Sequence, residues 1–351
     1  MDQLPQQLLN SAWQGAALAV FALGYSLVFG SLGIVNLAHG AVYMWGALLA
    51  FLCVSTFGWP LWIALPAAVA GAGLLAVLLE RIAFKPLRSL TAGSLVLWAG
   101  FLVLLAAFTV RWSAEVRWAI LAIAAVLALI GLAIDARTTR VLWQRDMPRL
   151  APMIASIGAS LVLVSLAQAA FGAQAMRLPP GTFPDAPVRL PGDLVITPIQ
   201  VLVLAVALAL MVALNMLLAK TSIGRAIRAV AWSERTSRLL GINVDRVISS
   251  TFFLSGGLAG AAGALLGLAY NRIQPLMGED VELAGLTVIV IGGLGSIRGV
   301  VVAAFLVGAL RVFSVAYLDS SLRDAFVFGL LILVLVVRPQ GLFGRAAAVR
   351  A

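Results

Sequence analysis

The sequence predicts an all-α, polytopic integral membrane protein. Hydrophobic residues make up 62% of the 351 residues and charged residues only 11%, whereas soluble domains are about 45–50% apolar and about 25% charged. The apolar residues also fall into runs of about 20, the length that crosses a bilayer as a helix. These two observations exclude a soluble enzyme, a nucleic-acid-binding domain and a disordered chain, and they make lipid the solvent of most of the protein.

Each membrane span is predicted from one apolar run. The nine runs of suitable length are 11–30, 38–57, 60–79, 93–110, 117–134, 151–172, 198–219, 248–270 and 323–337. A further run, 284–316, is too long for one crossing and is broken by glycines between 292 and 299. We expect it to form two short or re-entrant segments that meet at this glycine turn, because broken backbone at membrane depth needs protein or water around it. The total is ten or eleven transmembrane or re-entrant helices, and eleven is preferred.

The positive charges predict the orientation. One set of connections holds 17 Lys and Arg residues and consists of 80–88, 135–149, 220–246, the turn at 298 and the tail from 338. The alternate set holds 6 and consists of 1–10, 111–117, 173–197, 271–283 and 317–324. Because cytoplasmic connections are enriched in Lys and Arg, the N-terminus is predicted outside and the C-terminus in the cytoplasm. An odd number of crossings agrees with this assignment.

Motifs for catalysis or metal binding are missing from the sequence. It has no G-x-x-x-x-G-K-[ST] phosphate loop, and Lys85 and Lys220 are its only lysines, so we do not expect this chain to hydrolyse ATP. His39 and Cys53 are its only histidine and cysteine, so no catalytic residue, metal site or cofactor is predicted. His39 and Arg311 are the main ionisable groups within spans. This scarcity argues against self-contained ion-coupled transport.

The segment 220–246 is the most informative connection. It is basic and rich in helix-forming residues, and it reaches a helix stop at Gly241. The apolar and small residues at helical spacing are Ile227, Val230, Ala231, Leu239 and Leu240. One interpretation is a basic loop held by anionic lipid. The other is a docking helix for a cytoplasmic partner, which would pass the partner's motion into the membrane bundle.

Three features inside the spans each allow a structural interpretation. Asn36 and His39 precede the second run, where they either form the turn that opens a helix or line a pathway. Glycines spaced four apart in 248–270 predict a face for close helix packing. Arg311 is expected to pair locally or to extend toward the interface rather than to bind a substrate.

Four segments together resemble one family. They are G-Y-S-L-V-F-G-S-L-G-I-V-N-L-A-H-G (24–40), G-R-A-I-R-A-V-A with R-L-L-G-I-N-V-D-R-V (224–247), I-G-G-L-G-S-I-R-G (291–299) and R-P-Q-G-L-F-G-R (338–345). In this order they resemble the permease subunit of ATP-binding-cassette importers for branched-chain amino acids. The resemblance extends from near residue 11 to residue 345. It therefore predicts that residues 1–351 form a single permease domain.

The resemblance implies a complex in the bacterial inner membrane, with the N-terminus in the periplasm. Two permease subunits, identical or related, would associate with two cytoplasmic ATPase subunits, and a periplasmic binding protein would deliver the substrate. Lipid would surround the permease, and no nucleic acid is implied. ATP binding and hydrolysis by the partners would drive alternating access of the permease, which would translocate the amino acid.

The resemblance also assigns roles to residues. The loop matching 224–243 would dock on the ATPase, with the coupling residues Gly224, Arg225, Arg228, Ala231, Arg238, Leu239, Leu240, Gly241, Ile242 and Asn243. From the residues themselves we expect the pathway to be lined by Asn36, His39, Gly292, Gly293 and Gly295. The exposed backbone of the glycine turn is what would meet a polar solute there.

This sequence departs from the family pattern in three places. About 60 residues intervene between the K-P-L-R turn at 85–88 and the segment from 151. We interpret 92–149 as an inserted transmembrane hairpin without a transport role, anchored at the interface by Trp98, Trp112 and Trp118. Trp232 and Ser233 stand where the docking loop often carries acidic or amide residues. Ala284 or a neighbour replaces a lysine common before the glycine turn.

Other functions stay open at this stage. A permease for urea or short-chain amides would share the architecture, and no substrate-contacting residue in the sequence separates it from an amino-acid permease. A passive channel or an ion-coupled carrier belongs to a different class and would need neither the loop 224–243 nor an ATPase. An integral-membrane enzyme is the least supported, because the sequence shows no acid, base or metal constellation.

Overall fold

The structure is a computed structural model that describes residues 4–109, 114–137, 141–144, 150–179, 181–183, 186–190 and 194–344. The chain divides into two compact units, Met1–Ala76 with Gln174–Ala351, and Val77–Ala173. Among the described residues, eight helices are long and apolar enough to cross a membrane, and two further apolar helices are shorter. The prediction of an all-α polytopic membrane protein is confirmed.

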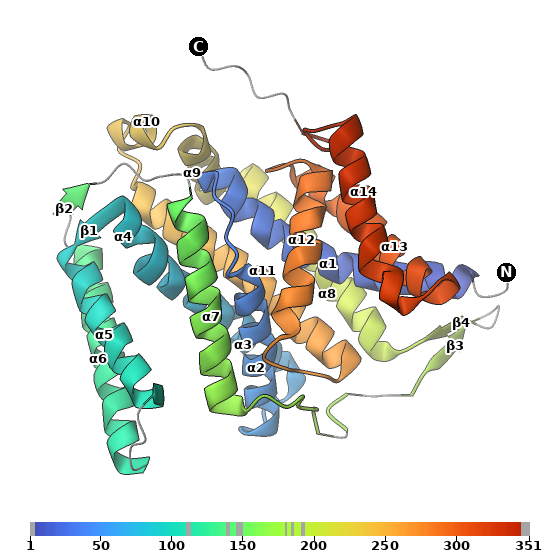
Figure 1. The fold of residues 1–351 in the computed structure, drawn as a ribbon, viewed down its shortest axis with the longest axis horizontal. Coiled ribbons are helices and arrows are strands. Elements are labelled where there is room, and N and C mark those ends of the chain that lie inside the picture. The colour runs from blue at the N-terminus through green and yellow to red at the C-terminus, as the bar shows by residue number, and fades with distance from the viewer. Residues whose placement is uncertain are drawn as a thin grey trace. The chain divides into compact units, whose positions relative to one another are not determined.

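The first unit is a helical bundle built around α1 (Leu4–Leu32) and α11 (Val244–Tyr270). Both helices are apolar on all sides, which is why most of each is buried. Its other helices are α2 (His39–Ser55), α3 (Leu61–Leu79), α8 (Pro198–Lys220), α9 (Ser222–Trp232), α10 (Glu234–Leu239), α12 (Met277–Gly292), α13 (Ile297–Tyr317), the 3₁₀-helix η2 (Ser320–Leu322) and α14 (Arg323–Val337). Figure 1 shows this bundle with the short hairpin of β3 (Val188–Leu190) and β4 (Leu194–Ile196).

The run 284–316 forms two helices, α12 and α13, that meet at the turn 293–296. The predicted break at the glycines is confirmed. Two details of the prediction were wrong. The helix α13 has 21 residues rather than being short, and α12 begins at Met277 although 271–283 was assigned to a connection. Acidic side chains at the start of α12 lower the local hydropathy, so the apolar run begins later than the helix does. Such side chains nevertheless favour a helix N-terminus.

The four-residue spacing of glycines in α11 serves helix packing, as predicted. Gly256 and Gly260 lie against Ala72 and Ala76 of α3, and Gly263 lies against the backbone of α2. Small side chains at this spacing let helices approach closely in lipid, where van der Waals contact drives association.

Connections that the charge rule assigned to the cytoplasm gather at one end of the first unit. The Leu342 N–H donates to the Ile291 carbonyl at 2.7 Å, which ties the tail to the α12–α13 turn. Figure 1 shows α9 and α10 at the same end as the C-terminal end of α14. The structure therefore groups these connections as the charge pattern did, while the side of the membrane that they face stays a prediction.

Segments of the alternate set also contact one another. The side chain of Gln6 exchanges two hydrogen bonds of 2.9 Å with the backbone of Val195. Met176 and Ile273 form an antiparallel bridge. The N-terminal segment thus contacts the predicted outer connection 173–197, which in turn contacts the predicted outer connection 271–283.

The second unit contains the predicted inserted hairpin. It comprises the π-helix η1 (Glu80–Phe84), α4 (Lys85–Arg88), β1 (Ser89–Thr91), α5 (Ala92–Thr109), α6 (Ala114–Arg137), β2 (Val141–Gln144) and α7 (Ala151–Phe171). The helices α5 and α6 pack side by side, and β1 pairs with β2 in antiparallel register (Figure 1). Of the predicted anchors, Trp98 and Trp118 are exposed. Outside the described residues lie Arg111, Trp112, Arg140, Arg145, Arg149, Arg345 and Arg350.

A buried ionic cluster closes the base of this hairpin. The Asp135 side chain of α6 has no exposed surface, and it accepts hydrogen bonds from Lys85 Nζ at 2.5 Å, from Thr91 Oγ1 at 2.8 Å and from Arg81. Nearby, Glu80 accepts from Arg88. The basic turn that the sequence placed in an exposed connection is therefore partly buried, because Asp135 supplies the opposite charge that burial of cations needs.

Candidate functional site

The helix α9 is held against the ends of three membrane helices. It begins after Thr221, whose Oγ1 accepts the Gly224 N–H at 3.1 Å. Ile227 and Val230 are buried, and α9 contacts α1, α8 and α11. The helical period predicted for these two residues is confirmed, and the segment is fixed to the bundle along that face.

The apolar pattern does not continue as one helical face. Ser233 is extended and caps a second helix, α10, by accepting the Thr236 N–H at 3.2 Å. Leu239 and Leu240 are exposed, at 81% and 75%. Ala231, at the end of α9, is exposed as well. The five apolar or small residues that the sequence places at helical spacing therefore do not share one buried face, and the break at Ser233 separates the last two from the first three. Trp232 is also exposed, at 79%.

The end of the segment has the geometry of a helix stop. Gly241 has φ +80°, a left-handed conformation that glycine adopts without steric cost. The Ile242 N–H donates to the Ser237 carbonyl at 3.0 Å and closes the turn. Asn243 then caps α11, because its Oδ1 accepts the Arg246 N–H at 3.1 Å. These hydrogen bonds fix the C-terminal end of the segment, and the bond between Thr221 and Gly224 fixes its N-terminal end.

The helices α9 and α10 that carry the exposed apolar side chains also carry exposed arginines. Arg225, Arg228 and Arg238 are exposed. Arg228 donates to the Leu218 carbonyl, and Arg238 lies 3.6 Å from Asp245 in a half-exposed ion pair. We call the exposed side chains of Arg225, Trp232, Arg238, Leu239 and Leu240 the α9–α10 surface. Large exposed apolar side chains with arginine among them are typical of protein-binding surfaces.

Asn36 and His39 lie in the interior of the first unit. Both are buried. Asn36 Oδ1 accepts the Ala38 N–H at 3.1 Å, and Ala38 rather than Asn36 occupies the N-cap position of α2. His39 Nε2 lies 3.1 Å from the Phe21 carbonyl oxygen, and its ring stacks on that of Tyr25 at 5.2 Å. The two residues thus form and anchor the turn before α2.

The glycine turn is bonded to the C-terminal segment. The Gly292 carbonyl accepts the Phe343 N–H at 3.2 Å, and Gly293 lies against Gly344. The motif at 291–299 and the described part of the second motif, 338–344, are distant in sequence and form one local structure. Part of the backbone that was predicted to meet a polar solute is thus bonded to the chain itself.

Arg311 pairs locally, as predicted. Its guanidinium lies 3.9 Å from the carboxylate of Asp324. Sequence reasoning missed a different ionisable group, Glu282, which α12 carries into the bundle. Its position two residues before the apolar run at 284 was the one available signal.

Comparisons with known proteins give the family. The family described as "Branched-chain amino acid transport system / permease component" matches residues 7–115 and 88–335. The chain belongs to this permease family. It is 31% identical to the high-affinity branched-chain amino acid transport system permease protein BraD of Pseudomonas aeruginosa, over 97% of this chain and 95% of that protein.

Further relatives agree with the assignment to this permease family. The identity to the permease protein LivH of Escherichia coli K12 is 30%, with the same coverage of 97% and 95%. A shorter match, 33% identical over 36% of this chain and 41% of the relative, joins it to the ribose import permease protein RbsC of Bacillus subtilis. The chain is therefore a multi-pass membrane protein of the transport permease type.

Proposed function

We propose that this permease is the membrane subunit of a bacterial inner-membrane importer for branched-chain amino acids, driven by two cytoplasmic ATPase subunits. A second permease subunit and a periplasmic binding protein complete the proposed complex. The supporting observation is the α9–α10 surface. One face of α9 is buried against α1, α8 and α11, while Trp232, Leu239 and Leu240 are exposed. A partner bound there would act directly on three membrane helices.

The mechanism follows from this rigid attachment. When ATP closes the ATPase pair, the two bound segments move together, and each α9 transmits that motion to the ends of α1, α8 and α11. The bundle then changes the side on which its pathway opens, as in other rigid-body switching transitions. Because linkage is reciprocal, delivery of substrate by the binding protein should in turn stimulate ATP hydrolysis.

Copurification of the ATPase tests the docking assignment. The variants Arg228→Glu and Leu240→Glu reverse or add charge at exposed side chains of the segment, and Leu239→Glu changes a side chain that is 81% exposed. We expect each to reduce the ATPase recovered with the permease and to abolish ATP-driven uptake. The matched control is Arg177→Glu, which changes an exposed arginine in a predicted outer connection. Wild-type recovery and uptake in all three variants would refute docking and favour a lipid-bound segment.

Uptake by the reconstituted complex tests the substrate. Proteoliposomes are loaded with the complex and given labelled leucine in competition with valine, urea, a short amide, and acidic or basic amino acids. We expect competition by valine alone. Competition by urea or the amide would move the substrate to that class. Concentrative uptake by the permease without ATPases would instead establish an ion-coupled carrier.

We further propose that the hairpin 92–149 has no transport role. Deletion with a short splice tests this proposal, but the deletion removes the carboxylate that binds Arg81 and Lys85. The splice is therefore combined with Lys85→Gln, so that a buried cation is not left unpaired. We expect normal uptake. Loss of uptake in a correctly inserted, ATPase-binding protein would show that the hairpin acts in transport.

The proposed pathway passes Asn36 and His39 in the interior of the first unit. We propose that the glycine turn with Gly292, Gly293 and Gly295 forms one end of this pathway. The C-terminal segment binds part of that turn, since the Phe343 N–H donates to the Gly292 carbonyl. Replacing His39 by Gln keeps a hydrogen-bond donor for the Phe21 carbonyl and changes the ring. We expect this variant to retain ATPase binding and to lose uptake, which separates a lining role from a folding role.

A further inference from the structure

The helix α2 begins deep within the first unit. After α1 ends at Leu32 the chain turns at Gly33, and His39 Nε2 lies 3.1 Å from the carbonyl of Phe21. Phe21 precedes Leu32 by 11 residues, which is about 16 Å of helical rise. The non-helical segment 33–38 therefore extends back into the bundle. Such backbone occurs at membrane depth where it is buried in protein or lines a cavity.

The first turn of α12 meets the first turn of α2 at this depth. A Cβ added to Gly40 would lie 2.5 Å from the Gly278 carbonyl oxygen, and one added to Gly278 would collide with the Gly40 carbonyl. The two backbones touch because both residues are glycine. Two helix N-termini therefore converge, and each carries a partial positive charge. Discontinuous helices that meet in this way form the substrate sites of many transporters.

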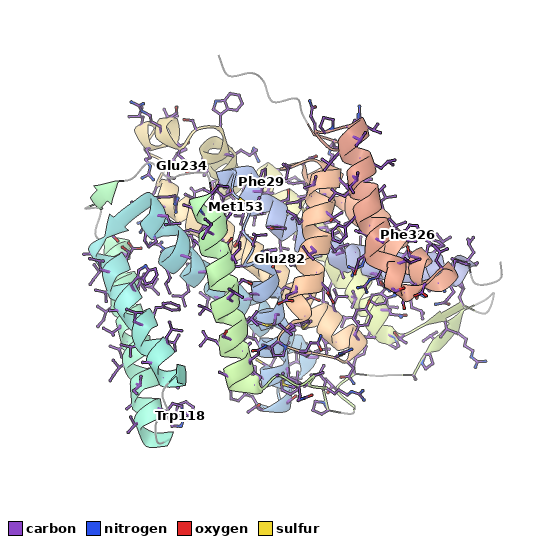
Figure 2. All side chains as sticks on the ribbon, in the orientation of Figure 1. Phe29, Trp118, Met153, Glu234, Glu282 and Phe326 are labelled. Atoms are coloured by element: carbon purple, nitrogen blue, oxygen red, sulfur yellow. The ribbon has the colours of Figure 1, made fainter. Side chains whose placement is uncertain are left out.

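Glu282 brings a carboxylate to this junction. It accepts the backbone N–H of Gly40, and its Oε2 would lie 2.6 Å from a Cβ on that glycine. Its other oxygen, Oε1, is buried and has no hydrogen-bond partner. Figure 2 shows Glu282 away from the ends of α12. One carboxylate oxygen of Glu282 thus accepts a hydrogen bond at the N-terminus of α2 and offsets its partial positive charge. The other oxygen is an acceptor without a donor.

Tyr25 contributes the complementary group from α1. Its side chain has no exposed surface, its ring stacks on His39 at the start of α2, and its hydroxyl has no hydrogen-bond partner. Tyr25 therefore lies beside His39, the residue before Gly40, whose backbone Glu282 contacts. Since most buried polar groups in proteins are paired, an unpaired donor and an unpaired acceptor at one junction call for a ligand that carries both kinds of group.

We propose that Glu282 and Tyr25 recognise the zwitterionic head of an α-amino acid during translocation. The Glu282 carboxylate accepts from the substrate ammonium, and the Tyr25 hydroxyl donates to the substrate carboxylate. Phe21 and Tyr43, whose rings lie 5.5 Å apart, offer an apolar wall for an aliphatic side chain. This inference rests on the proposed permease function. It selects an amino acid over urea or an amide, because only the amino acid carries a positive charge for Glu282.

A purely structural role for the two residues predicts different results. If Glu282 only compensates the α2 N-terminus, Glu282→Gln keeps the acceptor for Gly40 and should leave transport nearly unchanged. If the Tyr25 hydroxyl has no ligand, Tyr25→Phe removes an unsatisfied buried group and should not impair the protein. A substrate role predicts that both conservative variants lose transport while the complex stays assembled.

The test measures leucine uptake and ATP hydrolysis together. The full complex, with its ATPases and loaded binding protein, is reconstituted with wild type, Glu282→Gln, Tyr25→Phe or the control Glu279→Gln. Glu279 is exposed on the same helix. We expect the leucine moved per ATP hydrolysed to fall about tenfold or more in Glu282→Gln and about threefold to tenfold in Tyr25→Phe. ATPase copurification and stimulated hydrolysis should persist, and the control should match wild type.

The outcomes separate this inference from the proposed function. If the wild-type complex takes up leucine and both variants take it up equally well, the recognition site is overturned and the permease function is left intact. Wild-type transport of urea or an amide instead of leucine would overturn both the recognition site and the proposed substrate. If Glu282→Gln fails to assemble, Tyr25→Phe decides, since it removes a single unpaired hydroxyl. A parallel loss of hydrolysis and uptake in Tyr25→Phe would indicate a structural role and overturn the inference.

Discussion

Two carboxylates, Asp135 in the second unit and Glu282 in the first, have opposite surroundings. Asp135 in the second unit accepts hydrogen bonds from two cations and a hydroxyl. Glu282 in the first unit accepts one backbone N–H and leaves an oxygen unpaired. The two therefore differ in the number of their partners. The Asp135 carboxylate is satisfied and holds the hairpin together, whereas the Glu282 carboxylate keeps one oxygen for the ligand that we propose.

The physical basis is the cost of removing a charge from water. Within the second unit that cost is offset by Arg81 and Lys85, which themselves need Asp135. Within the first unit the compensation for Glu282 comes from the N-terminus of α2, whose partial charge is about half a unit. Partial compensation leaves Glu282 able to attract a positive group, whereas Asp135 has no free oxygen to offer.

The largest effect is expected for Asp135→Ala. Removing this carboxylate leaves two buried or partly buried cations unpaired, which costs about 3–5 kcal/mol in the free energy of unfolding. Denaturant or thermal unfolding of the purified protein measures the loss. Adding Lys85→Met should restore part of the stability by removing one unpaired cation. A loss below about 1 kcal/mol would show that the cluster is solvated and would remove the contrast with Glu282.

A much smaller loss is expected for Glu282→Gln. The amide oxygen can still accept the Gly40 N–H, and no cation is left without a partner, so the free energy of unfolding should change by about 1 kcal/mol or less. The same unfolding assay compares it with Asp135→Asn, which makes the identical chemical change at a carboxylate bound to two cations. Equal losses in the two variants would mean that Glu282 has a charged partner and is structural.

The smallest effect, of opposite sign, is expected for Tyr25→Phe. Its hydroxyl is buried without a partner, so removing it should stabilise the protein by up to about 1 kcal/mol while keeping the ring on His39. The matched variant is Tyr43→Phe on α2, which makes the same chemical change at another buried tyrosine. Destabilisation by Tyr25→Phe would show that the Tyr25 hydroxyl has a hydrogen-bond partner within the protein. Glu282 would then be the one remaining residue of the proposed recognition site.

Much of the fold follows from local sequence. The runs 198–219 and 323–337 agree with α8 and α14 within a residue, because length and hydropathy are properties of each segment alone. The caps at Ser233 and Asn243 have the residue types that favour helix starts. The candidate site was only partly predictable. Asn36 and His39 were named from their place before a span, but the outward turn of Leu239 was not, since it depends on the break at Ser233.

The amino-acid sequence by itself determined the class of protein, the positions of the membrane helices and the family, since each depends on composition, local periodicity or motifs in order. Only the tertiary structure decided which charges are paired and which helix starts meet. Glu282 looks like part of a polar connection until α12 brings it to Gly40 of α2. The reason is that the energy of a buried charge depends on neighbours from other helices, and hydropathy along one segment carries no information about them.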